Sequence, residues 1–484
     1  MDNLSIKNIL KFISITEIAL SLFFLMPVTV GYIYNENAND FLIFDILCLI
    51  ISVSIFLMLR KHKVDLTIKE GILSVNLVWI LLGFMGAFPL IIYTNINLSS
   101  GFFEAISGFT TTGATVYSDI ESLPKMILML RSLTHWLGGM GIIVLGVGLF
   151  SLINPSGSLA LFKAESTGIS TEKLTPKIKD TALRLWGVYA FITLLDIIAL
   201  HIEGMGIFDA INHAFSTIST GGFSTKNASL GYFNDNSIII WTTTFFMLIS
   251  GINFLAHLRF FHNDMSGYES EEVVWYIKIF LILSMVLSLI HYYTTADSFY
   301  FSLTHGFFTI SSILTTTGFV TLNYEHWGQF AVVVVFVAML IGGNAGSTAG
   351  GMKVIRYVIL FKSLGIEIKK ILYPNAMFGM FLNGSKVKDN ILGATVGFLM
   401  LFIISNVVLT FYLYARGYDA LTSLSAAVAC VGNIGPGFGH VGPVDNYSFF
   451  SWYDKIILAI FMIIGRLEFY TVALLFTKSF WKKF

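Results

Sequence analysis

Four short segments rich in threonine and glycine carry the residue types best suited to binding a cation. In one-letter code they read ISGFTTTGAT (106–115), FSTISTGGFS (215–224), SSILTTTGFV (311–320) and VACVGNIGPG (428–437). We call them glycine segments 1 to 4. Threonine hydroxyls and backbone carbonyls are uncharged oxygen ligands that can replace the water shell of a monovalent cation. The pattern therefore predicts a cation filter.

The four glycine segments align with one another as copies of one unit. Each has a glycine at its eighth position, an apolar residue four positions earlier and a small residue six positions earlier. The three sets are Gly113, Gly222, Gly318 and Gly435; Phe109, Ile218, Leu314 and Val431; and Ser107, Ser216, Ser312 and Ala429. Successive glycines are roughly 100 residues apart, which leaves room for a helix, a half-length helix and a second helix.

The predicted filter takes three residues from each glycine segment. Glycine reaches positive φ easily, so successive carbonyls can turn inward, and a half-length helix directs its negative C-terminal end at the ion. A single TTTG sequence is most often a helix cap or a packing site, but four copies favour a pore. Segment 4 lacks threonine, so the ring cannot be fourfold symmetric. The candidates are Thr111, Thr112 and Gly113; Thr220, Gly221 and Gly222; Thr316, Thr317 and Gly318; and Asn433, Ile434 and Gly435.

The composition indicates that a lipid bilayer surrounds the elements that position these segments. Of the 484 residues, 55% are hydrophobic and 12% are charged, and the mean hydropathy is +0.78. Soluble domains carry about 25% charged residues. Lys and Arg number 29, equal to Asp and Glu, so no basic field exists to hold nucleic acid. The chain is predicted to be an integral membrane protein.

Ten apolar runs are candidates for membrane-spanning helices, because about 20 apolar residues cross the hydrocarbon core. The eighth run is short for a crossing. Most of the Lys and Arg residues flank the runs on one side, which predicts that both termini are cytoplasmic and that the glycine segments face outward. The runs lie near 12–33, 41–59, 71–93, 126–153, 182–202, 237–258, 273–293, 329–343, 391–415 and 454–477.

A second glycine-rich stretch, GGNAGSTAGG at 342–351, interrupts the eighth apolar run. We call it the glycine-rich loop. A straight helix is unfavourable here, because each glycine destabilises a helix by about 1 kcal/mol relative to alanine. Backbone outside a helix is tolerated at membrane depth where it is buried or lines a watery cavity. We expect a break inside the membrane that lines the pore, with an ordinary cytoplasmic turn as the alternative. No strand precedes it and no Gly-Lys-Ser/Thr follows, so it is not a phosphate loop.

Arg466 stands near the middle of the last apolar run, in the sequence IIGRLEFY. An arginine at the bilayer centre costs at least ~2.5 kcal/mol, so it should face water or a carboxylate. Glu468 is only two positions away and is a poor partner within one helix. Two interpretations stay open: an ion pair with another helix, or a cation in the pore that binds backbone oxygens of residues 346–351.

Other polar residues near the runs have more ordinary expected roles. His135, His213 and His305 have no partner at helical spacing and are expected to pack inside the protein. Glu104, Asp209 and Asp419 could cap amides or attract cations to the outer mouth, and the sequence does not separate these roles. Asp196 and Glu468 are expected to face protein or water. The basic segment 353–390 is a solvated face or a dock for an acidic partner.

These motifs together resemble the Trk/Ktr/HKT superfamily of potassium transporters over essentially the whole chain. The matches are the four glycine segments, HWLGGMG at 135–141, GNAGSTAGG at 343–351 and the helix that contains Arg466. Two extra N-terminal spans before the fourfold unit resemble the TrkH branch. Related plant proteins that transport sodium carry serine at the first filter glycine, whereas this chain has Gly113, which favours potassium.

The resemblance implies a fold, a function and partners. The expected fold is an all-α polytopic membrane protein with two N-terminal helices and four pseudo-symmetric helix, half-helix and helix repeats around one pore. The expected function is potassium uptake across the bacterial cytoplasmic membrane by a homodimer. A TrkA-type cytosolic ring would bind nucleotide and control the gate, and this chain would need no cofactor. The gate would consist of Gly346, Ser347, Thr348, Ala349, Gly350, Gly351 and Arg466.

The repeats predict the division of the chain. The expected units are an N-terminal helix pair (1–70), pore repeat 1 (71–175), pore repeat 2 (176–265), pore repeat 3 with the gating loop (266–380) and pore repeat 4 (381–484).

Two other classes of protein, a coupled carrier and an intramembrane enzyme, are alternatives to a potassium filter. A proton- or sodium-coupled carrier with alternating access usually has repeats of inverted topology, whereas these four enter from one side. Whether flux is passive or coupled as symport stays open. An intramembrane enzyme would need a nucleophile–base pair, a zinc motif or paired aspartates, which the sequence lacks.

Overall fold

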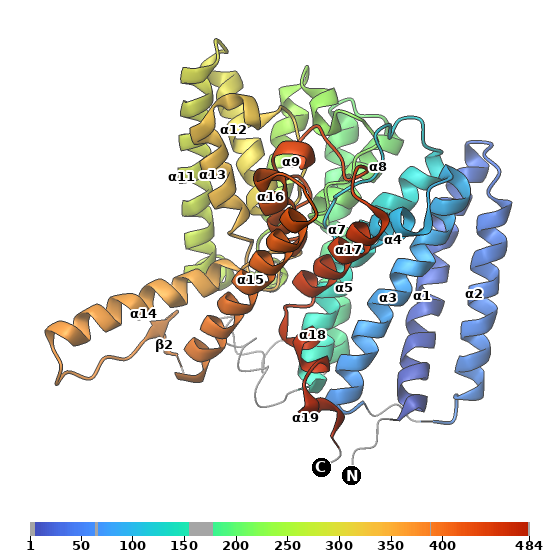
Figure 1. The fold of residues 1–484 in the computed structure, drawn as a ribbon, viewed down its shortest axis with the longest axis horizontal. Helices are drawn as coiled ribbons and strands as arrows, with labels where there is room; N and C mark the ends of the chain where they lie inside the picture. Colours follow the sequence, from blue (N-terminus) through green and yellow to red (C-terminus); the bar gives the residue numbers. More distant parts are fainter. Residues whose placement is uncertain (1–4, 63–65, 154–177, 388, 483–484) are drawn as a thin grey trace.

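The computed structural model describes residues 5–62, 66–153, 178–387 and 389–482. An N-terminal pair, α1 (Ile6–Ile33) and α2 (Asn39–Met58), stands at one edge of the molecule (Figure 1). The first turn of α3 (Ile68–Thr94) carries a capping box between Thr67 and Glu70. The Glu70 carboxylate also accepts the Ser5 amide at 2.5 Å and so joins the start of α1 to the start of α3.

The rest of the chain repeats a helix, a half-length helix and a second helix. The half-length helices are α4 (Leu98–Phe109), α8 (Ile207–Ile218), α12 (Phe299–Leu314) and α16 (Ala420–Val431). The helices around them are α3 with α5 (Lys125–Ile153), α7 (Ile178–Ile202) with α9 (Ser237–Ser250), α11 (Glu271–Thr294) with α13 (Gln329–Met339), and α15 (Asp389–Ala415) with α17 (Trp452–Arg466). The expected order of elements is confirmed.

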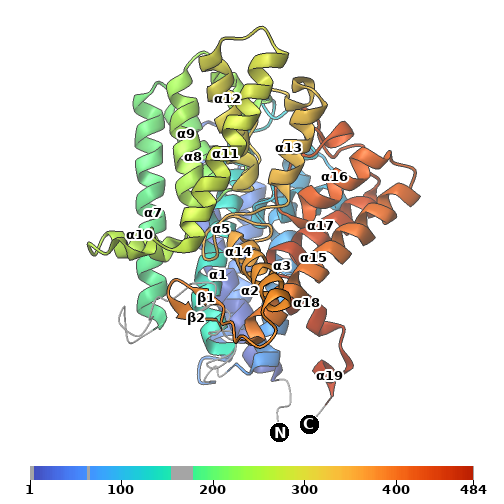
Figure 2. The same cartoon turned by 90° about the vertical axis from the view of Figure 1, so that its left-hand side faces the viewer.

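Shorter elements connect these helices. They are α10 (Phe254–Phe260), α14 (Val354–Leu372), α18 (Tyr470–Leu475), α19 (Lys478–Trp481) and the 3-10 turns η2 (Ser229–Phe233), η3 (Met265–Gly267), η4 (Tyr324–Trp327) and η5 (Gly439–Val441). A small antiparallel hairpin pairs β1 (Phe381–Leu382) with β2 (Ser385–Lys386). Helix α14 projects sideways from the bundle, with the hairpin beside it (Figures 1 and 2).

Six helices within the described ranges are long and apolar enough to cross a membrane: α1, α2, α3, α7, α11 and α15. Two of the other predicted spans differ from straight helices. The run 237–258 bends by 98° between α9 and α10. The run 454–477 breaks after Arg466, where Glu468 and Phe469 have φ of 59° and 56°. Arg466 therefore ends a helix instead of standing within one.

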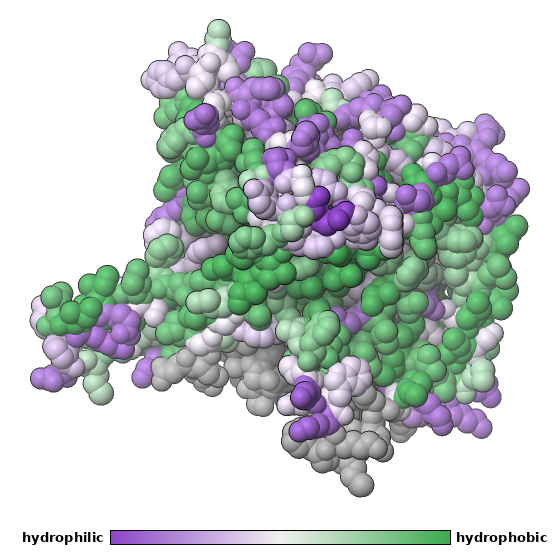
Figure 3. Space-filling model, in the orientation of Figure 1, coloured by the Kyte–Doolittle hydropathy of each residue, from purple (hydrophilic) through white to green (hydrophobic). Residues whose placement is uncertain are grey.

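The outer surface fits a lipid environment. An apolar band crosses the molecule, with polar surface above and below it (Figure 3). Apolar side chains exposed on α2, among them Ile43, Leu47 and Ile50, contribute to such a surface. The half-length helices have the opposite character, because α4 is buried from Ser99 to Phe109 and α16 is buried over most of its length. The interior of this protein thus holds the ends of the half-length helices.

Candidate functional site

Each half-length helix ends at the apolar residue that the four glycine segments share: Phe109, Ile218, Leu314 and Val431. The chain then turns in the same way four times. In each segment, the backbone amide of the residue before the shared glycine donates to the carbonyl of the shared small residue, five positions earlier. These bonds are Thr112 to Ser107 (2.9 Å), Gly221 to Ser216, Thr317 to Ser312 and Ile434 to Ala429 (each 2.8 Å).

The backbone conformation repeats as well. Left-handed φ occurs two residues before the glycine, at Thr111 (54°), Thr220 (54°), Thr316 (57°) and Asn433 (54°). It occurs again at the glycine itself, at Gly113 (79°), Gly222 (85°), Gly318 (81°) and Gly435 (95°). Three of the first set are threonine, a residue that rarely takes this conformation. Alternation of left-handed residues along a strand can turn successive carbonyls to one side, as a filter requires.

The four glycine segments meet one another in a closed ring. A Cβ atom on Gly113 would lie 2.2 Å from the carbonyl oxygen of Gly221 in the next segment. The other contacts follow in order: Gly222 against Thr317 O (2.0 Å), Gly318 against Ile434 O (2.1 Å) and Gly435 against Thr112 O (2.5 Å). Segment 4 returns to segment 1, so the structure brings all four sets of predicted filter residues together.

The side chains lower the symmetry of the ring. Segments 1 and 3 share a hydroxyl pair, Thr110 with Thr112 and Thr315 with Thr317, each at 2.7 Å. In segment 4 the Asn433 amide instead donates to the Thr112 hydroxyl at 3.0 Å. Segment 4 thus bonds to the neighbouring segment through Asn433 and has no threonine pair of its own.

Residues behind the ring hold it in shape, and the sequence did not identify their positioning role. The His135 ring lies against Gly221, where a Cβ would come within 2.3 Å of it, and His135 Nδ1 donates to the Gly108 carbonyl at 2.7 Å. The Tyr447 hydroxyl donates to the Gly435 carbonyl at 2.7 Å. For His135, its place in the HWLGGMG motif could have indicated this role, whereas no sequence pattern marks Tyr447.

The glycine-rich loop lies directly against the helix side of the ring. The Gly350 amide donates to the Thr316 hydroxyl at 2.6 Å. The Thr348 hydroxyl donates to the Ile218 carbonyl at the end of α8 (3.0 Å) and also contacts the Ser250 carbonyl at 3.2 Å. The loop therefore joins glycine segments 2 and 3 to the bend between α9 and α10.

Two buried basic side chains, of Arg466 and Lys353, bind backbone oxygens of the same loop. Arg466 Nη1 donates to the Thr348 carbonyl at 2.9 Å, and Lys353 Nζ donates to the Ala349 carbonyl. Arg466 is 4% exposed, and among the described residues its Nε and Nη2 atoms have no hydrogen-bond partner. Glu468 pairs instead with Arg356 on α14 at 2.8 Å. Of the two interpretations of Arg466, the contact with the loop backbone is the one observed.

The carboxylates of the half-length helices have different roles. Glu104 is buried, pairs with Arg131 at 2.9 Å and accepts the Val116 amide at 2.8 Å. Asp209 lies 3.4 Å from the ammonium of Lys226. Asp419 caps α16, and although burial opposes ionisation, hydrogen bonds from Thr422 leave the pKa of Asp419 below its usual value.

The buried histidines and Asp196 behave as expected. His213 and His305 are buried and hydrogen-bonded, to Ser224 Oγ (2.8 Å) and Thr321 Oγ1 (2.9 Å) respectively. Together with His135 they confirm the packing role. Asp196 is fully buried within the protein, and both its carboxylate oxygens lack a hydrogen-bond partner in the part of the chain that the structure describes.

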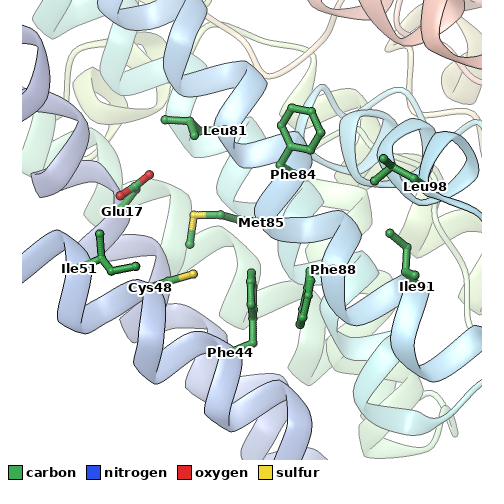
Figure 4. A pocket seen from close by; sticks show the side chains of 10 residues that line it. All are labelled: Glu17, Phe44, Cys48, Ile51, Leu81, Phe84, Met85, Phe88, Ile91 and Leu98. Atoms are coloured by element: carbon green, nitrogen blue, oxygen red, sulfur yellow. The ribbon is translucent and has the colours of Figure 1, made fainter.

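Two hollows differ in position and character. The four ring glycines line a small polar hollow of about 100 Å³, together with Lys226 and Asp445. An apolar crevice of about 370 Å³ lies between α2 and α3, with Glu17 at one side (Figure 4). Since its lining residues come from α1 to α4 and none from the ring, the crevice is separate from the predicted filter.

The fold and the ring define a class of protein: a polytopic all-α membrane protein with four pore half-helices in one chain. The model of the TrkH family, described as cation transport protein, matches residues 37–278 and 274–483. The chain belongs to this family.

The sequence is similar to that of named potassium uptake proteins over nearly its full length. The chain is 36% identical to the Trk system potassium uptake protein TrkH of Salmonella typhimurium, covering 99% of both chains. It is 34% identical to the potassium uptake protein TrkG of Escherichia coli, covering 96% of both. The crystal structure of the potassium transporter TrkH from Vibrio parahaemolyticus matches with a TM-score of 0.89 and 34% identity, over 98% of this chain and 99% of that one. These relatives are named as transporters, which confirms the expected class over an enzyme.

Proposed function

We propose that this chain takes up potassium across the bacterial cytoplasmic membrane, along the axis of the ring formed by the four glycine segments. The observation that carries the proposal is the closure of that ring. Each glycine faces the carbonyl of the next segment, and segment 4 returns to segment 1. A ring of carbonyl oxygens from one chain can take the place of the water molecules that a cation loses when it enters.

The ion class follows from the chemistry of the ring. The ring residues are uncharged, and four helices direct their C-terminal ends, with their negative partial charge, toward it. Such a site favours a monovalent cation over an anion. Glycine at all four ring positions favours potassium over sodium, and the named relatives are potassium uptake proteins.

The proposed gate is the segment Gly346–Gly351 of the glycine-rich loop together with Arg466. The loop lies against the ring through Gly350 and Thr316. Arg466 donates to the carbonyl of Thr348 within the loop. A buried guanidinium at this point repels entering cations and holds the loop across the path, so its release would open the pore.

The proposed assembly is a homodimer with one pore per subunit and a TrkA-type cytosolic ring that binds nucleotide. Segment 353–390, which includes the projecting helix α14 and the hairpin, is the proposed dock for that ring. Its lysines and arginines suit an acidic surface, and both termini would lie on the same cytoplasmic side. The Trk system names of the relatives support a system of more than one component.

Rubidium uptake into proteoliposomes tests the function. The purified full chain should accumulate radioactive rubidium without added substrate, and external potassium should suppress uptake at concentrations about tenfold lower than sodium does. Empty liposomes give the background. Equal suppression by sodium and potassium would contradict a potassium filter, and uptake only with an imposed sodium or proton gradient would favour the coupled carrier.

A further inference from the structure

Two consecutive glutamates at the start of α11 bind different parts of the cytoplasmic side of the protein. Glu272 is 2% exposed, and one of its carboxylate oxygens accepts two backbone amides. The first is Ala345 in the glycine-rich loop, at 2.7 Å, and the second is Ile355 in the first turn of α14, at 3.3 Å. One buried carboxylate oxygen therefore joins three elements: α11, the loop and α14.

Glu271 binds α14 and the hairpin instead. Its carboxylate forms an ion pair with Lys362 on α14 and accepts the Asn383 amide in the hairpin turn at 2.9 Å. Lys362 also donates to the Phe381 carbonyl at 2.8 Å. The start of α11 is thus a junction at which α14 and the hairpin attach to the bundle, and Glu272 extends that junction to the loop.

The far end of the loop is attached to α14 as well. Lys353, the residue before α14, donates to the Ala349 carbonyl, and Arg356 in the first turn of α14 pairs with Glu468. The start of α14 is therefore joined to the loop twice: the Glu272 carboxylate bridges Ile355 to Ala345, and the ammonium of Lys353 binds the Ala349 carbonyl. Charge-assisted hydrogen bonds of this kind are about twice as strong as neutral ones.

We propose that Glu272 is a positioning residue for transport: its carboxylate fixes the start of the glycine-rich loop to α11 and α14 and so keeps the loop beneath the ring. The inference rests on the proposed function of that loop as the gate. A displacement of α14 that keeps the Ile355 bond must shift Glu272, and that shift moves the acceptor of the Ala345 amide. Glu272 thereby links the position of α14 to the loop without touching the ion path.

Hydrogen exchange in the full chain, in lipid nanodiscs, reads this bond directly. In Glu272→Ala the amides of a peptide covering 342–355 should exchange at least about tenfold faster, because the buried acceptor is lost. Glu272→Gln keeps a neutral acceptor of the same shape and should give a smaller increase. Glu269→Ala removes an exposed carboxylate three residues earlier and should change nothing. Unchanged exchange at 342–355 in folded Glu272→Ala and Glu272→Gln would overturn the proposal.

Rubidium uptake by the same variants separates this inference from the proposed gate. Basal uptake should rise about threefold or more in Glu272→Ala, and less in Glu272→Gln, because a loosened loop obstructs the path less. Faster exchange with unchanged uptake would support the positioning role and contradict the loop as a gate. Glu272→Gln keeps the test open where Glu272→Ala fails to fold, since it preserves the volume of the side chain.

Discussion

At Gly113 a hydrogen atom is all that the ring can accommodate. A Cβ atom would lie 2.2 Å from the Gly221 carbonyl, well inside contact distance, and the φ of 79° disfavours any other residue. The carbonyl of Gly221 would have to move, and with it the geometry by which the ring distinguishes ions of different radius.

Gly113→Ser should therefore loosen selectivity. We expect the ratio of rubidium to sodium flux to fall by about tenfold, equivalent to ~1.4 kcal/mol of lost discrimination. Gly417→Ser is the matched control: its φ is also positive (95°), but nothing lies within 4 Å of its added Cβ. Both ratios are measured in proteoliposomes, and an unaltered ratio in Gly113→Ser would remove Gly113 from the filter.

Sequence reasoning could find the ring residues because they repeat, and it missed residues that do not. Asn433 was predicted as a filter position through alignment on Gly435. Its bond to Thr112 lies across a separation in sequence that no local pattern reveals. Glu272 gave no signal for the same reason, since its partners Ala345 and Ile355 are far from it in the chain.

At the scale of elements, the glycine-rich loop is held from several sides. Hydrogen bonds from Gly350 and Thr348 attach it to Thr316 and Ile218 of the glycine segments, and Arg466 fixes its Thr348 carbonyl. The break between α17 and α18 places Arg466 at a helix end, where its side chain meets the loop. The loop of the third repeat is thus bound by a charged side chain, Arg466, from the fourth repeat.

Arg466→Ala should conduct rubidium faster, by about tenfold, because a buried positive charge near the path costs an entering cation more than ~1 kcal/mol. Its dependence on a cytosolic partner should decrease as well. Arg60→Ala, which removes an exposed arginine after α2, is the control. Uptake is compared only between variants that elute from a size-exclusion column as folded protein. Slower uptake by such an Arg466→Ala protein would contradict the barrier role.

Element lengths followed from the sequence better than element directions did. The length of the apolar runs predicted α1, α2, α3, α7, α11 and α15, because a bilayer imposes a length on each. The bend of 98° after α9 was not predicted, and it lies at a contact between residues far apart in the sequence: Gly251 O accepts the Asn344 amide of the loop at 2.8 Å. The break after Arg466 likewise lies beside distant partners, because Arg466 binds the Thr348 carbonyl and Glu468 pairs with Arg356.

At the scale of the whole molecule, four repeats build one site that no repeat could build alone. Each supplies a half-length helix, a glycine and a carbonyl, and closure of the ring depends on the relative placement of all four. The repeats can be counted from the sequence, but the contacts that close them into a ring join residues about 100 positions or more apart, which no local pattern reveals. The loop and Arg466 then belong to repeats 3 and 4, so the proposed gate is asymmetric although the ring is nearly fourfold.

The central claim is that the ring itself binds the transported ion. Anomalous diffraction from crystals of the full chain grown in rubidium chloride, with sodium chloride crystals as the control, locates bound rubidium directly. The account predicts an anomalous peak on the axis enclosed by the carbonyl oxygens of Thr112, Gly221, Thr317 and Ile434, absent in sodium. Rubidium bound elsewhere, with no peak inside that ring, would contradict it.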